Sequence, residues 1–116
     1  MHKILFICHG NICRSPMAEF LLKDIVRKRG LANEFEIASA ATSREEIGNP
    51  VHHGTKHKLA QLGISVAGKT ARQVTARDYR YYDLLLVMDN NNIRNMRRLL
   101  GEDVDDKVHL LLDYTP

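Results

Sequence analysis

A cysteine and an arginine stand six positions apart in the stretch Cys-His-Gly-Asn-Ile-Cys-Arg-Ser-Pro, residues 8–16 of the chain. An apolar run precedes this stretch and an amphipathic segment follows it, which predicts a strand, a tight loop and the start of a helix. In that frame the N–H groups of the loop and the positive end of the helix can converge on one anion. Cys8 would then lie beside an anion cradle, where a thiol can act as the nucleophile for a phosphate ester.

The residue types in the loop suit this chemistry. A free cysteine thiol is only a few per cent ionised near pH 7, and helix N-termini and nearby cations favour the thiolate. Gly10 lets the backbone take conformations with positive φ and approach a ligand closely, and Asn11 also tolerates a left-handed conformation. The planar guanidinium of Arg14 can bind two phosphoryl oxygens at once. Ser15 is expected to cap the following helix, with Pro16 at its first position, and its hydroxyl can also bond Cys8 or Asn11.

Strand-like and helical segments alternate along the chain, and this alternation must position the loop. Residues 39–50 indicate a loop, and residues 66–77 give no clear pattern. The alternation predicts an α/β fold in which a parallel sheet carries helices on both faces. Ligands bind such sheets beyond the carboxyl ends of the strands, where Cys8 is expected to lie. We expect strands at 3–7, 35–38, 83–88 and 108–112, and helices from Ser15 to about Gly30, over 52–62, and from Asp89 or Asn90 to about Leu100.

Length and composition narrow the class of protein. The 116 residues suit one domain, and no run approaches the ~20 apolar residues of a membrane span. The N-terminus lacks the features of a signal peptide, so we expect a cytoplasmic protein without a membrane partner. Two cysteines argue against a disulfide framework. A net charge of +3 favours anionic ligands, but without tryptophan and with 6% aromatic residues we expect no nucleic-acid partner.

The loop closely resembles the phosphate-binding loop of the low-molecular-weight protein tyrosine phosphatases. Other segments resemble the same family: 39–43, 47–50, 71–73 and 88–89. The resemblance implies a three-layer sandwich with a four-stranded parallel sheet of order 2-1-3-4 and flanking helices. It also implies hydrolysis of phosphotyrosine in proteins, and of small aryl phosphates, through a phosphocysteine intermediate. Family members need no metal or other cofactor, and phosphate or sulfate would occupy the loop.

The resemblance assigns roles to individual residues. Cys8 would be the nucleophile, Arg14 would bind and stabilise the phosphoryl group, and Ser39 would support the loop together with Asn11 and Ser15. Cys13 would be the second loop thiol, which in relatives forms a reversible disulfide with the nucleophile. The residues expected around the bound phosphate are His9, Gly10, Asn11, Ile12, Cys13, Ser15 and Glu45.

Three features depart from the family pattern. The family carries a catalytic Asp-Pro and a closing helix beyond the last strand, so we expect residues 1–116 to form one domain truncated at its C-terminus. Glu45 stands where several relatives carry an aromatic residue that lines the substrate cleft, and Lys69 where some carry a histidine that supports the loop asparagine. Asp113 and Asp89 follow predicted strands and could substitute for the acid, but we expect Asp89 to cap the next helix instead.

Other functions stay open at this point. A related arsenate reductase would need cysteines further downstream, which this chain lacks. A protein-arginine phosphatase of the same family commonly has threonine where this chain has Ile12, and the isoleucine favours tyrosine. A phosphate-binding module without catalysis is a third alternative because the acid segment is missing. His53 and His57 could share a helix face, but with no third ligand nearby we expect solvated side chains and no metal.

Overall fold

The sheet is built on β1, His2–Cys8, which pairs with β2, Phe35–Ala41, on one side and with β3, Leu84–Val87, on the other. β3 also pairs with β4, Val108–Leu110. All three pairings are parallel and the order is β2-β1-β3-β4, which confirms the predicted 2-1-3-4 sheet. This computed structural model describes residues 1–114 of the chain.

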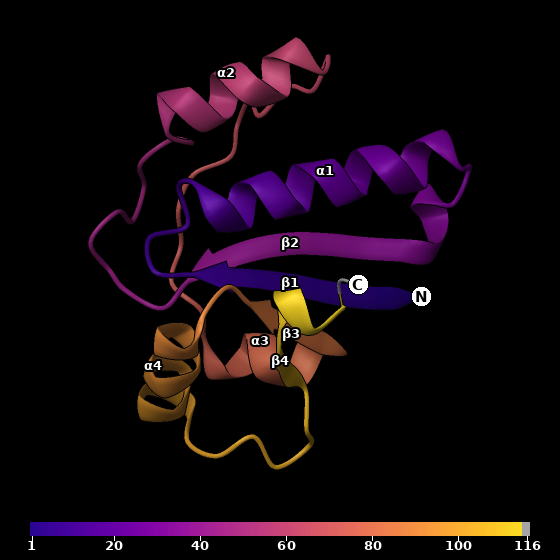
Figure 1. The fold of residues 1–116 in the computed structure, drawn as a ribbon. Helices are drawn as coiled ribbons and strands as arrows, with labels where there is room; N and C mark the ends of the chain where they lie inside the picture. Colours follow the sequence, from indigo (N-terminus) through magenta and orange to yellow (C-terminus); the bar gives the residue numbers. More distant parts are fainter. Residues whose placement is uncertain (115–116) are drawn as a thin grey trace.

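Helices cover both faces of the sheet and make the predicted three-layer arrangement (Figure 1). α1, Arg14–Lys28, lies on one face, and α2, His53–Gln61, packs on the outer side of α1. α3, Ala76–Tyr81, and α4, Asn90–Leu100, lie on the opposite face. No helix within the described part of the chain is long and apolar enough to cross a bilayer.

Residues 4–7 of β1 and all of β3 are apolar, as expected for central strands that are covered on both faces. Side chains alternate between the faces of a strand, so Leu5 and Leu85 pack with Met96 of α4, whereas Phe6 packs with Val26 of α1. β1 is held by its pairing with β2 and β3 and by packing on both of its faces. The carboxyl end of β1 therefore delivers Cys8 to the edge of the sheet in a rigid frame.

Several boundaries differ from the sequence prediction. The expected Ser15 cap is wrong, because α1 begins at Arg14, its N-cap residue Cys13 makes no side-chain cap bond, and Pro16 is the third helical residue. The Ser15 hydroxyl is instead used by the loop, as described below. The first three residues of the expected 39–50 loop, Ser39, Ala40 and Ala41, instead continue β2, because they pair with β1.

The remaining differences concern short elements. The strand expected over 108–112 ends at Leu110 and turns into a 3-10 helix, Leu111–Tyr114. Another 3-10 turn, Ala32–Glu34, precedes β2. α3 lies in the region without a clear pattern, since six residues are too few to show helical periodicity. The cap of α4 is Asp89, one of the two expected residues.

The capping box that begins α3 also holds an arginine. Asp78 accepts hydrogen bonds from the Thr75 N–H at 2.8 Å and from both terminal nitrogens of Arg72 at 2.8 and 3.1 Å. Burial alone would raise the pKa of Asp78, but the hydrogen bonds from Arg72 and Thr75 outweigh it and hold the pKa below its ordinary value. The ionised form of Asp78 is therefore the form that stabilises the fold.

We expect Asp78→Asn to lower the free energy of unfolding by about 1–2 kcal/mol at pH 7, because an amide cannot accept all of these bonds. The folded pKa lies below the unfolded one, so this contribution is complete above about pH 4 and is lost as the pH falls through the folded pKa. Urea denaturation of wild type and variant at pH 7 and pH 3 tests this, since the difference should shrink at pH 3. Asp105→Asn, which changes an exposed carboxylate, is the control and should shift neither curve. An equal deficit of Asp78→Asn at both pH values would contradict the assignment.

Candidate active site

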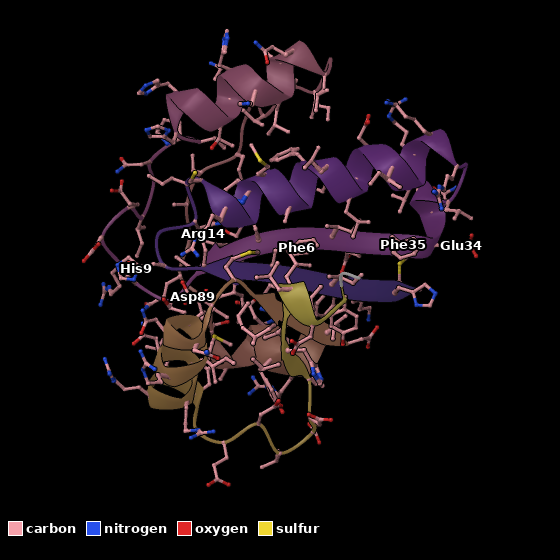
Figure 2. The ribbon with its side chains drawn as sticks, viewed as in Figure 1. Phe6, His9, Arg14, Glu34, Phe35 and Asp89 are labelled. Carbon is pink, nitrogen blue, oxygen red and sulfur yellow. The ribbon has the colours of Figure 1, made fainter. Side chains whose placement is uncertain are left out.

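The cysteine of the loop lies at the end of β1 with its sulfur held by two groups. Cys8 is 3% exposed, and its Sγ accepts a hydrogen bond from the Asn11 N–H at 3.3 Å and lies 3.1 Å from the Ser15 Oγ. It nevertheless lines an open cavity of about 240 Å³. Figure 2 shows His9, Arg14 and Asp89 gathered at this end of the sheet. The sulfur is thus immobilised at the floor of a site that a ligand can enter.

Asn11 ties the loop to two other parts of the chain. Its φ of 59° is left-handed, a conformation that asparagine tolerates better than most residues. Its Nδ2 donates to the Ser15 Oγ at 2.8 Å and to the Ser39 Oγ at 2.9 Å, while its Oδ1 accepts from the Arg72 N–H at 3.2 Å. The left-handed residue of the loop is therefore Asn11, and Gly10 does not use the positive φ that it permits.

These bonds fix the direction in which each hydroxyl donates. Ser39 donates to the Glu19 carboxylate and so accepts from Asn11. Ser15 also accepts from Asn11, which leaves its proton free to point at the Cys8 sulfur. Hydrogen bonds donated to a sulfur favour its anionic form. The arrangement can therefore stabilise a thiolate at the end of β1.

Glu19 is a member of this network that the sequence analysis did not identify. It is buried, 3% exposed, and pairs with Lys23 on α1. The Lys69 Nζ lies 3.7 Å from the Glu19 Oε1 and donates a hydrogen bond to the Ser39 carbonyl at 3.0 Å. Lys69 therefore supports Ser39 directly. Burial lowers the pKa of Lys69, against the opposing effect of Glu19. The spacing of Ser15, Glu19 and Lys23 on one helix face is the only local signal for this role.

Arg14 projects from the first turn of α1 toward α4. Its Nη1 lies 3.0 Å from the Asp89 Oδ2. The Asp89 Oδ1 accepts a hydrogen bond from the Asn92 N–H and thereby caps α4. Burial alone would raise the pKa of Asp89, but the Asn92 N–H and Arg14 hold it below its ordinary value. Asp89 is thus ionised at neutral pH, where it pairs with Arg14 and is not poised to donate a proton.

The cavity brings together most of the predicted residues. Asn11 and Ser15 are buried behind the loop and do not line the cavity, and Ser39 lies behind them on β2. Glu46 lines the cavity although the sequence analysis did not select it. The predicted residues that do line the cavity are Cys8, His9, Gly10, Ile12, Cys13, Arg14 and Glu45.

The other candidates lie apart from the cavity. Asp113 is exposed in the last 3-10 helix, and His53 and His57 are exposed on α2. Cys8 and Cys13 are both free thiols, and the Cys13 Sγ accepts a hydrogen bond from the Thr55 hydroxyl at 3.1 Å. Among residues 1–114, no cluster of three or more histidine, cysteine, aspartate or glutamate side chains could hold a metal ion.

Comparisons with known proteins give one consistent result. A family model described as low molecular weight phosphotyrosine protein phosphatase matches residues 3–116. The chain is 42% identical to the low molecular weight protein-tyrosine-phosphatase YfkJ of Bacillus subtilis, over 98% of this chain and 73% of that protein. It is 36% identical to the human low molecular weight phosphotyrosine protein phosphatase, over 97% of this chain and 72% of that one.

Solved structures agree with these matches. The crystal structure of YfkJ matches with a TM-score of 0.95 over 99% of this chain and 72% of that chain. A low molecular weight protein tyrosine phosphatase from Streptococcus pyogenes, 39% identical, matches with a TM-score of 0.86 over 95% of this chain and 71% of that chain. The described part of this chain therefore shares the fold of these proteins over the segments that match.

Proposed function

Since the chain belongs to the low molecular weight phosphotyrosine protein phosphatase family, we propose that it hydrolyses phosphotyrosine through a phosphocysteine at Cys8. The observation that carries this proposal is the position of one sulfur. The Cys8 Sγ accepts the Asn11 N–H at 3.3 Å and lies 3.1 Å from the Ser15 Oγ, in the cavity that Arg14 also lines. Phosphotyrosine-containing proteins and small aryl phosphates are the substrates that fit this site.

The first step transfers the phosphoryl group to the enzyme. The Cys8 thiolate attacks phosphorus, the S–P bond forms, and the P–O bond to tyrosine breaks. The electron pair of that bond leaves on the phenolic oxygen, which takes up a proton from water. Arg14 turns from Asp89 to bind two phosphoryl oxygens through its planar fork. That fork and the loop N–H groups match the charge that spreads over these oxygens in the transition state.

The second step releases inorganic phosphate. Water attacks phosphorus, the S–P bond breaks, and the electron pair returns to the sulfur. The Ser15 hydroxyl, at 3.1 Å, stabilises the departing thiolate as it stabilises the attacking one. The scheme uses protein groups and water alone.

The apolar part of the cavity favours an aromatic leaving group. Ile12 lines the cavity beside Cys8 and offers a phenyl ring an apolar surface. It offers a guanidinium no hydrogen-bond acceptor from its side chain. Phosphotyrosine therefore fits this wall better than phosphoarginine does.

Trapping the intermediate tests the proposal. We expect rapid acid quenching during p-nitrophenyl phosphate turnover to capture one phosphoryl group, which peptide mapping by mass spectrometry assigns to Cys8. A phosphotyrosine peptide should release phosphate, and the matching phosphoserine peptide, whose shorter side chain does not bring its phosphate to a recessed sulfur, should release far less. Absence of phosphate release, or an adduct confined to Cys13, would contradict the proposal.

A further inference from the structure

Two glutamates line the cavity beside the cysteine loop, and the backbone fixes the segment that carries them. The Thr42 N–H donates to the Cys8 carbonyl and the Ser43 N–H to the His9 carbonyl, each at 3.0 Å. The segment after β2 thus runs alongside the loop. It brings the Glu45 Oε2 to 3.0 Å from the His9 Nε2, at the cavity rim.

Glu46 is held against the loop by a different pair of contacts. Its Cγ would lie 3.4 Å from a Cβ added at Gly10, so the bare backbone of Gly10 gives this side chain its place. Its Oε2 accepts a hydrogen bond from the Asn49 Nδ2 at 2.6 Å. Both carboxylates of the rim are therefore positioned by named partners before any substrate arrives.

The cavity is lined by the basic side chain of Arg14 and by the acidic side chains of Glu45 and Glu46. Arg14 is the one arginine or lysine among the residues that line the cavity within the described chain, and the proposed function assigns it to the phosphoryl oxygens. When Arg14 turns to the phosphate, Asp89 loses that partner and adds a further negative charge nearby. The groups of a substrate next to its phosphate then meet Glu45 and Glu46, which repel acidic side chains and attract basic ones.

We propose that Glu45 and Glu46 select substrates in which the phosphotyrosine is flanked by lysine or arginine. This inference rests on the proposed function and specifies its substrate class. Exposed charge pairs are individually weak, so each carboxylate is expected to contribute about threefold in kcat/KM, and the two together about tenfold.

The test compares two phosphotyrosine peptides that differ only in having lysine or glutamate on both sides of the phosphotyrosine. We expect the wild type to show a kcat/KM about tenfold higher for the lysine peptide at low salt, and a smaller ratio at 0.5 M salt. Glu45→Gln and Glu46→Gln should each lower the ratio about threefold. Glu34→Gln is the matched control, because it removes the same charge from an exposed side chain at the opposite end of the sheet (Figure 2). Its ratio should equal that of the wild type.

The outcomes separate this inference from the proposed function. Equal kcat/KM values for the two peptides, or a preference for the glutamate peptide, would overturn the inference while the proposed function stands. A ratio that falls as far in Glu34→Gln as in Glu45→Gln would also overturn it, because net charge and not the rim would then be responsible. Failure to release phosphate from either peptide or from p-nitrophenyl phosphate would overturn the proposed function, and this inference with it.

Discussion

Replacing Cys8 with serine is expected to lower kcat for p-nitrophenyl phosphate by at least about 10⁴-fold, because a serine hydroxyl is almost never ionised near neutral pH. The loop is built for sulfur: the Asn11 N–H and the Ser15 Oγ stand 3.3 and 3.1 Å from the Sγ. A serine oxygen sits on a shorter bond and would be drawn toward Ser15 and away from the cavity. Steady-state rates with the aryl phosphate measure the loss.

The same variant separates chemistry from binding. The backbone N–H groups of the loop and Arg14 remain in Cys8→Ser, so it should still bind inorganic phosphate in isothermal titration calorimetry. Cys13→Ser is the matched comparison, since it removes the other loop thiol and should still form the phosphoenzyme. Turnover at the wild-type rate by Cys8→Ser would exclude Cys8 as the nucleophile. A folded Cys8→Ser that binds no phosphate would exclude the loop as the anion cradle.

Local patterns were sufficient to predict the sheet and the loop. The apolar run of β3 and its neighbour β1 predicted two buried parallel strands, and the residue types of 8–16 predicted the strand–loop–helix frame around Cys8. Asp89 was predicted as a helix cap because it follows a strand and precedes a helical pattern, and the structure confirms it. These features depend on residues close together in the sequence, so the sequence shows them directly.

Features that depend on distant contacts could not be predicted in the same way. Ser15 looked like a helix cap, but Asn11 and Cys8 compete for its hydroxyl, and α1 begins at Arg14, two residues before the expected first position at Pro16. Glu19 was not identified from the sequence because its partners come from elsewhere in the chain. Ser39 lies on β2, and Lys69 is 50 positions away.

The buried network also explains why a charged group lies beneath the loop. A carboxylate that is 3% exposed is costly unless it is paired, and Glu19 has both Lys23 and Lys69 within ion-pair distance. This pairing keeps Glu19 an acceptor, which makes Ser39 a donor toward it. Ser39 then accepts from Asn11, which also donates to Ser15 and leaves the Ser15 proton for the Cys8 sulfur. Buried side chains therefore hold the loop in place together with its backbone.

Arg14→Lys is expected to lower kcat by about 10²–10³-fold with a much smaller change in KM, because a lysine keeps the positive charge but loses the planar fork. Arg14 exchanges its 3.0 Å contact with the Asp89 Oδ2 for the phosphoryl oxygens, and its guanidinium can bind two of them at once, whereas an ammonium has no planar fork. A contact that strengthens in the transition state appears in kcat, so kcat and KM must be measured separately. Arg98→Lys, the same change at an exposed position of α4, is the control and should retain wild-type values. If Arg14→Lys stays within threefold of the wild type, two-point binding by Arg14 does not stabilise the transition state, and charge alone accounts for its role.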